Sequence, residues 1–139
     1  MRIEILDVLD DVEEPQGPRI SIRGPLGQVW AHWRGSGTPR VGDAADVEID
    51  IPDDVVSWVH AEGPDTLRAE APGGPVRIRG AVVAADEDAV VSIRLSADIL
   101  LVEFATARHP EEQGGPDMPS IGDRIELSVP HIDIYPYSV

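Results

Sequence analysis

The chain has 139 residues, a formal net charge of −15 at pH 7 and no cysteine, which excludes disulfide bonds, thiolate catalysis and cysteine-ligated zinc. The negative charge opposes binding to nucleic acid phosphates or to an anionic membrane surface, because like charges repel during encounter. No apolar run is long enough to span a membrane, and Glu4 and Asp7 interrupt the apolar residues where a signal peptide needs an unbroken run, so we expect a cytoplasmic protein.

The first part of the chain alternates between apolar and polar residues in short runs, the pattern of half-buried strands. Gly24-Pro25-Leu26-Gly27 fits a tight turn, with proline at its second position, and predicts a hairpin. We expect strands over Arg2–Leu9, Arg19–Arg23, Gln28–Arg34, Asp46–Ile51 and Val55–His60.

The run Ala61–Pro75 is rich in glycine and proline and offers little beyond Leu67 to bury, so it is interpreted as a connector. Ser96–Arg108 fits either a helix capped by Ser96 or a strand, and its match to the first hairpin favours the strand. In the second part we expect strands over Val76–Ala84, Val90–Arg94, Ile99–Phe104, Asp123–Val129 and Ile132–Tyr137.

An internal repeat organises these strands. Ile20–Trp33 matches Val91–Phe104, with Ser-Ile-Arg in common, and each copy is followed by a Gly-Asp step and an alternating strand that ends in proline. The match predicts equivalent core positions for Ile22 and Ile93 and for Trp33 and Phe104. The expected fold class is all-β, with two OB-like, five-stranded small barrels from an internal duplication and little or no helix. The expected units are residues 1–60, a connector 61–75, and residues 76–139.

The order of elements is that of a small Greek-key barrel of the OB type. The segment Ile121–Ile134 resembles the end of TOBE domains, the OB-like modules appended to transporter ATPases, which in tandem form the molybdate-binding molbindins. The resemblance implies an oxyanion site between barrels, built from backbone amides and Ser, Thr or Lys side chains. This chain has no lysine, and Asp53, Asp54 and Asp133 add negative charge where an anion would bind.

Loops between strands 1 and 2 and between strands 4 and 5 border the binding face of an OB barrel. Here these loops carry acids in both units, which predicts a face suited to a basic protein partner. Two other interpretations stay open: ordinary solvated turns, and a codon bias that also explains why all 11 basic residues are arginine. The loops are Asp10–Glu14, Pro52–Asp54, Asp86–Asp88 and Pro130–Asp133.

Two further patterns predict contact residues. Trp30, His32 and Arg34 share one face of a strand, and interface anchors favour Trp and Arg, although both faces of this hairpin are alternatively covered by the fold. His131 and Asp133 share a strand face as a weak metal-binding or base–orienter pair, or alternatively belong to an exposed turn.

The sequence contains no catalytic motif such as a GxSxG elbow, a phosphate-binding loop or HExxH. We therefore expect a non-catalytic acidic binding protein that engages a basic protein in the manner of an immunity protein or inhibitor, without a cofactor or a metal. The alternatives are a molybdate-type oxyanion binder, and an accessory protein or enzyme. The expected partner-binding residues are Trp30, His32, Arg34, Asp53, Asp54, Asp86, Glu87, Asp88, His131 and Asp133.

Overall fold

The computed structural model describes residues 1–9, 17–105 and 118–137. Within these ranges the chain forms strands and no helix, which confirms the all-β prediction, and none of the described residues belongs to a helix that could cross a membrane. The ambiguous segment after Ser96 is a strand as far as Glu103, as its match to the first hairpin predicts.

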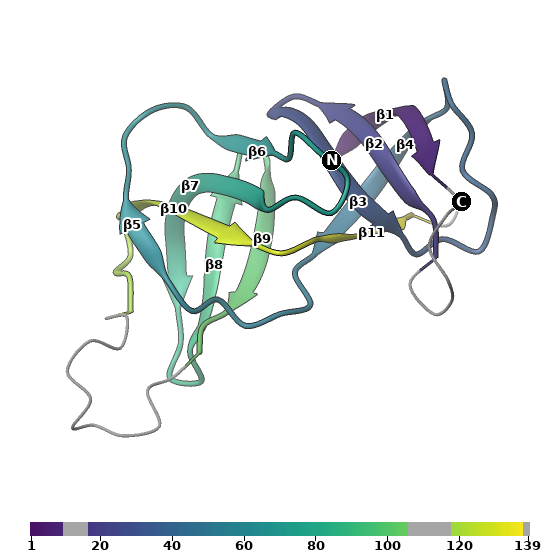
Figure 1. The fold of residues 1–139 in the computed structure, drawn as a ribbon. Helices are drawn as coiled ribbons and strands as arrows, with labels where there is room; N and C mark the ends of the chain where they lie inside the picture. The colour runs from purple at the N-terminus through teal and green to yellow at the C-terminus, as the bar shows by residue number, and fades with distance from the viewer. Residues whose placement is uncertain (10–16, 106–117, 138–139) are drawn as a thin grey trace.

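Five strands close into a barrel at the N-terminal end of the molecule (Figure 1). Around the barrel the order is β1, β2, β3, β11 and β4, and β1 pairs with β4 to close the ring. Closure leaves none of these five strands with a free edge for a second chain. The bounds are β1 Arg2–Leu9, β2 Arg19–Gly24, β3 Gly27–Trp33, β4 Ala44–Asp50 and β11 Asp133–Pro136.

The remaining strands form a second sheet in the order β5, β10, β7, β8 and β9, with the short strand β6 also paired to β7. Val55 makes an isolated parallel bridge to Phe104, just past β9, and brings the two ends of this sheet together. The bounds are β5 Trp58–His60, β6 Thr66–Arg68, β7 Val76–Ala85, β8 Val90–Leu95, β9 Asp98–Glu103 and β10 Arg124–Val129.

Two strands lie in the opposite unit from the one we expected. The last strand, β11, leaves the second sheet and inserts into the barrel, parallel to β3 and antiparallel to β4. Conversely β5, which we expected in the barrel, pairs with β10 in the second sheet. The assignment of each to its own unit was therefore wrong, because alternation identifies a strand but not its partner. How independently residues 1–60 and 76–139 fold stays a prediction.

The two units repeat the same local geometry. β1 has a bulge between Ile5 and Asp7, and β7 has one between Val82 and Ala84. In both units the Ser-Ile dipeptide of the repeat lies opposite the bulge, on β2 in the barrel and on β8 in the second sheet. A bulge adds twist, which helps a short sheet to curl toward closure.

The Gly-Asp step of each repeat is hydrogen-bonded to the bulged strand next to this bulge. Gly42 N–H donates to the Ile5 carbonyl and Gly122 N–H donates to the Val82 carbonyl, both at 2.8 Å. The two glycines have φ values of 92° and 96°, a region that residues with a Cβ rarely adopt. The backbone conformation of this turn thus explains the glycine in each copy of the repeat.

The predicted core equivalences are confirmed. Ile22 and Ile93 are fully buried, and Trp33 and Phe104 are buried at the ends of their hairpins. Their amides make equivalent hydrogen bonds of 2.9 Å, from Trp33 to the Pro18 carbonyl and from Phe104 to that of Ala89. An origin of the two units by duplication stays a prediction.

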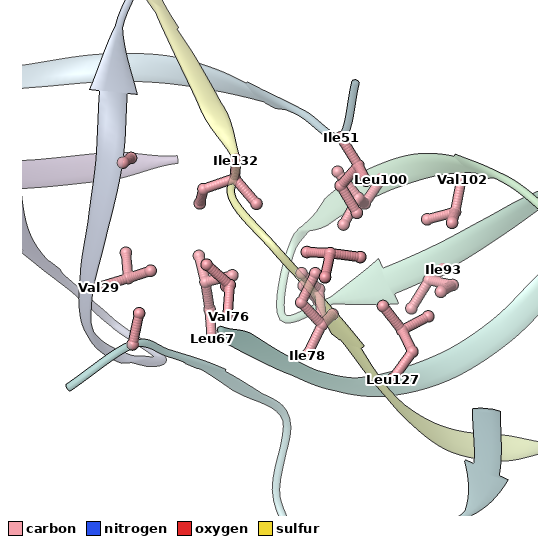
Figure 2. Packing of buried hydrophobic residues seen from close by; sticks show 14 of the residues in the cluster. Val29, Ile51, Leu67, Val76, Ile78, Ile93, Leu100, Val102, Leu127 and Ile132 are labelled. Atoms are coloured by element: carbon pink, nitrogen blue, oxygen red, sulfur yellow. The ribbon is translucent and has the colours of Figure 1, made fainter. Parts of the chain in front are cut away.

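One continuous core joins the barrel and the second sheet. Figure 2 shows Val29, Leu67, Val76 and Ile132 gathered where the chain passes from β10 to β11. Ile132 is completely buried at this crossing, and Leu67 comes from the connector, which supplies β6. The crossing segment is therefore part of the packing and not a solvated linker.

Replacing Ile134 with alanine tests the packing of β11. This side chain is completely buried, so Ile134→Ala should lower the free energy of unfolding by about 2–5 kcal/mol. Tyr135→Ala, at the adjacent position that is 42% exposed, is the matched control and should lower it by less than about 1 kcal/mol. Urea unfolding checks both values, and equal losses would contradict the packing of β11.

Dividing the chain at the connector tests the exchange of strands. A fragment of residues 1–75 lacks β11, so β3 and β4 keep open edges and we expect no cooperative unfolding transition. Mixing it with residues 76–139 should restore the circular dichroism spectrum and the transition of the intact chain. A cooperative transition in the first fragment alone would show that the barrel closes without β11.

Candidate functional site

A cluster of three possible metal ligands lies where β3 and β11 run side by side. His32 on β3 pairs with Asp133 at the start of β11, and His131 lies two residues earlier. Nδ1 of His32 is 3.7 Å from Oδ1 of Asp133, and the two imidazole rings have centroids 4.9 Å apart. One ligand atom from each residue lies within 4.8 Å of those of the other two.

Strand geometry explains why these three residues meet. Alternate residues of a strand share a face, so the buried Ile132 points into the core while His131 and Asp133 point the other way. On β3 the same alternation places Ala31 in the core and His32 on the outer face of the barrel. The parallel pairing of β3 with β11 then brings the two outer-face groups together.

This outer face is less exposed than the face of an isolated barrel. His32 is 8% exposed and Asp133 is 4% exposed. The connector hydrogen-bonds to the start of the hairpin strand, with Leu67 N–H donating to the Leu26 carbonyl at 3.4 Å and Ala69 N–H donating to that of Gln28 at 3.2 Å. The polar cluster therefore lies near the junction between barrel and second sheet.

Burial lowers the pKa of His32 below its usual 6.5. Positive charge on His131, Arg34 and Arg19 acts in the same direction, whereas the carboxylate of Asp133 opposes it. At neutral pH the His32 imidazole is thus uncharged, and one of its ring nitrogens carries a free lone pair.

Two atoms of the cluster are buried without a hydrogen bond from any described residue: Nδ1 of His32 and Oδ1 of Asp133. Their side chains are 10% and 6% exposed. Arg34 provides an ion pair, with Nε 3.3 Å from the same Asp133 oxygen. A buried polar atom left without a partner costs about 1–3 kcal/mol, so such atoms often mark a bound water or ion.

The outer part of the cluster is open to solvent. Nδ1 of His131 lies 3.5 Å from Oδ2 of Asp53, and these side chains are 36% and 48% exposed. Solvent exposure therefore increases across the cluster, from the buried pair His32 and Asp133 to the half-exposed pair His131 and Asp53.

Half of the predicted site residues meet here. The cluster contains His32, His131 and Asp133, with Arg34 and Asp53 as their ion-pair partners. The structure thus unites two patterns that the sequence offered separately, one on β3 and one at the start of β11.

The other predicted residues lie elsewhere. Trp30 is half-buried on β3 opposite Ser21, and Asp54 is exposed beside Asp53. The exposed acids of residues 86–88 form the β7–β8 turn, where the Asp86 carboxylate accepts N–H bonds from Asp88 and Val90. The acidic loop expected over residues 10–14 lies outside the described residues.

Arg19 also lies beside His32, although it was not among the site residues predicted from the sequence. It pairs with His32 across the hairpin, and its charge helps to lower the pKa of His32. The signal was available, because a turn centred on Gly24–Gly27 fixes the register and places residue 19 opposite residue 32.

No protein family model, no curated protein and no solved structure matches this chain. The closed five-stranded barrel is compatible with an OB-like architecture. Membership of the TOBE and molbindin family stays a prediction.

The titration of His32 tests the electrostatics of the cluster. We expect an NMR titration midpoint below 6.5, lowered further in Asp133→Asn because the carboxylate raises the pKa. Glu87→Gln, at an exposed acid of the β7–β8 turn, is the control and should leave the midpoint of His32 near that of the wild type. Since the unfolded state then binds the proton first, His32 should make the free energy of unfolding fall as the pH drops below 6.5. A midpoint at or above 6.5 would contradict this account.

Proposed function

We propose that this protein is a non-catalytic binding protein that engages the basic surface of another protein, as an immunity protein or inhibitor does. The support comes from an acidic strip on the barrel. Every second residue of β4 faces outward, and the turn that follows continues the negative charge. The strip consists of the exposed residues Asp46, Glu48, Asp50, Asp53 and Asp54.

Most of the charge on this strip is not neutralised within the described part of the chain. Asp46 pairs with an exposed Arg2 at 3.3 Å, and Asp53 pairs with His131. Glu48, Asp50 and Asp54 have no ion pair with a described residue. Unpaired acids on one face attract a basic partner and speed its association, and this observation carries the proposal.

The equivalent strand of the second sheet is different. On β10, Glu126 occupies the position of Asp46, and each of these acids pairs with an arginine of the neighbouring strand, Arg79 at 2.8 Å and Arg2 at 3.3 Å. The positions of Glu48 and Asp50 hold Ser128 and Pro130, so the unpaired acids occur on β4 and not on β10. A bias in composition acts on both strands, so this contrast favours a functional strip over composition alone.

Two tyrosines give the acidic strip aromatic neighbours. Tyr135 on β11 pairs with Glu48 in register and is 42% exposed, and Tyr137 is 57% exposed. The backbone N–H of Tyr137 donates to the Asp46 carbonyl at 3.0 Å, which holds this residue beside β4. Tyrosine is enriched at the energetic centres of protein interfaces, so acids and tyrosines together fit a protein partner.

The oxyanion alternative finds less support in the described cluster. Arg34 is the cationic group of the cluster that an anion would use, and the Asp133 carboxylate already lies against it at 3.3 Å. A second negative group would have to displace this carboxylate or lie beside it. Oxyanion binding and an enzymatic role both stay predictions.

The strip is tested with the isosteric double variant Glu48→Gln/Asp50→Asn. Capture from native lysate at low ionic strength should recover a dominant basic protein that salt releases. After purification of that partner, calorimetry should show affinity reduced at least about tenfold in the strip variant, since close charge pairs contribute about 1.5 kcal/mol or more.

The matched control is Glu62→Gln/Glu70→Gln, which changes the charge equally at two exposed acids of the connector. It should retain the affinity of the wild type apart from a small general effect of net charge. Recovery of no basic protein, or equal losses in both double variants, would contradict the proposal.

A further inference from the structure

We propose that His32, His131 and Asp133 bind a divalent transition-metal ion of the zinc class, at the junction of β3 and β11. The inference does not rest on the acidic strip, because it concerns an inner cluster and a ligand of different chemistry; the two share Asp53. It extends the weak sequence signal of His131 and Asp133 by a third ligand that only the fold supplies.

The ligand set suits such an ion. Two imidazoles and one carboxylate are donors for Zn²⁺, Co²⁺, Ni²⁺ and Fe²⁺, whereas Ca²⁺ and Mg²⁺ prefer oxygen alone. Zinc bonds of about 2.0–2.1 Å place tetrahedral donors roughly 3.3 Å apart. The His32 and Asp133 atoms are 3.7 Å apart and the whole set lies within 4.8 Å, so small side-chain rotations complete the geometry.

Two buried atoms without a hydrogen bond are an independent sign of a ligand. Nδ1 of His32 and Oδ1 of Asp133 lie 3.7 Å apart, too far for a hydrogen bond, on side chains that are 10% and 6% exposed, and the Asp133 oxygen also has its ion pair with Arg34. A metal ion between them gives a partner to the His32 nitrogen and a second one to the Asp133 oxygen.

An outer shell for the ligands is already present. Metal-bound histidines commonly donate their other N–H to a carboxylate, and Nδ1 of His131 faces Asp53 in this way at 3.5 Å, leaving Nε2 for the metal. Arg34 holds the Asp133 carboxylate from the other side at 3.3 Å. The half-exposed His131 offers a route from solvent.

The charge around the cluster limits its affinity without removing it. Arg19 and Arg34 repel a dication, while Asp133 and Asp53 attract it. The rival explanation is a structural His–Asp pair bridged by water, which has no affinity for a metal. The two explanations therefore differ in a direct binding measurement.

The test uses the full chain, freed of metal by a chelator. Calorimetry with ZnCl₂ should show a single ion bound per chain, and CoCl₂ should give the visible absorption of a low-coordinate site. His131→Gln and Asp133→Asn should each weaken zinc binding at least about tenfold, as loss of a ligand or of its support does. His60→Gln is the control, because His60 lies on β5 against the Trp58 ring, outside the cluster, and should bind zinc as the wild type does.

A thermal unfolding series provides a second measurement. Zinc should raise the Tm of the wild type and of His60→Gln but not that of His131→Gln, because a ligand bound to the folded state alone stabilises it. Absence of zinc and cobalt binding in the wild type would overturn the proposal. Equal binding or equal Tm shifts in wild type and His131→Gln would also overturn it. The half-exposed position of His131 keeps this variant foldable even if Asp133→Asn is not.

Discussion

The insertion of β11 between β3 and β4 is the constraint on which the rest of the structure depends. Without it these two strands face each other across an open seam, and their backbone groups lose their hydrogen-bonding partners. The strand β11 follows the strands of the second sheet in the sequence. The barrel is therefore completed by a strand from the far end of the chain. The reciprocal pairing of β5 with β10 ties the second sheet to the first part of the chain. The continuous core around Ile132 is the packing consequence of this exchange.

The candidate metal ligands are a chemical consequence of the same insertion. The side chain of Asp133, at the start of β11, and that of His131, two residues before it, meet on the side of the sheet away from the buried Ile132. The neighbour on β3 contributes His32, almost a hundred residues away in the chain. Burial near the junction then makes these groups costly to leave without partners. A bound ion would connect β3 to the crossing segment and so stabilise the exchange itself.

The acidic strip shows that the two units use the same backbone for different surfaces. Strands β4 and β10 have equivalent positions, yet Ser128 on β10 stands where β4 has Glu48, which lies unpaired beside Tyr135. The unpaired acids Glu48, Asp50 and Asp54 therefore follow one another along β4 and the turn after it. The candidate metal ligands lie at the end of this strip, and Asp53 belongs to both. Occupancy of one is thus expected to alter the electrostatic field of the other.

The sequence by itself determined the strands, the hairpins and the repeat. Alternation at Ile20–Trp33 and Val91–Phe104 is local, and turn geometry fixes register within a hairpin, so Ile22 and Ile93 were correctly predicted to be buried and even Arg19 opposite His32 was derivable. The partners of β5 and β11 were decided only by the tertiary structure, because a strand's pattern is satisfied equally by either sheet. The meeting of His32 with His131 and Asp133 followed from the pairing of β11 with β3, since contacts between distant residues depend on packing and not on local periodicity.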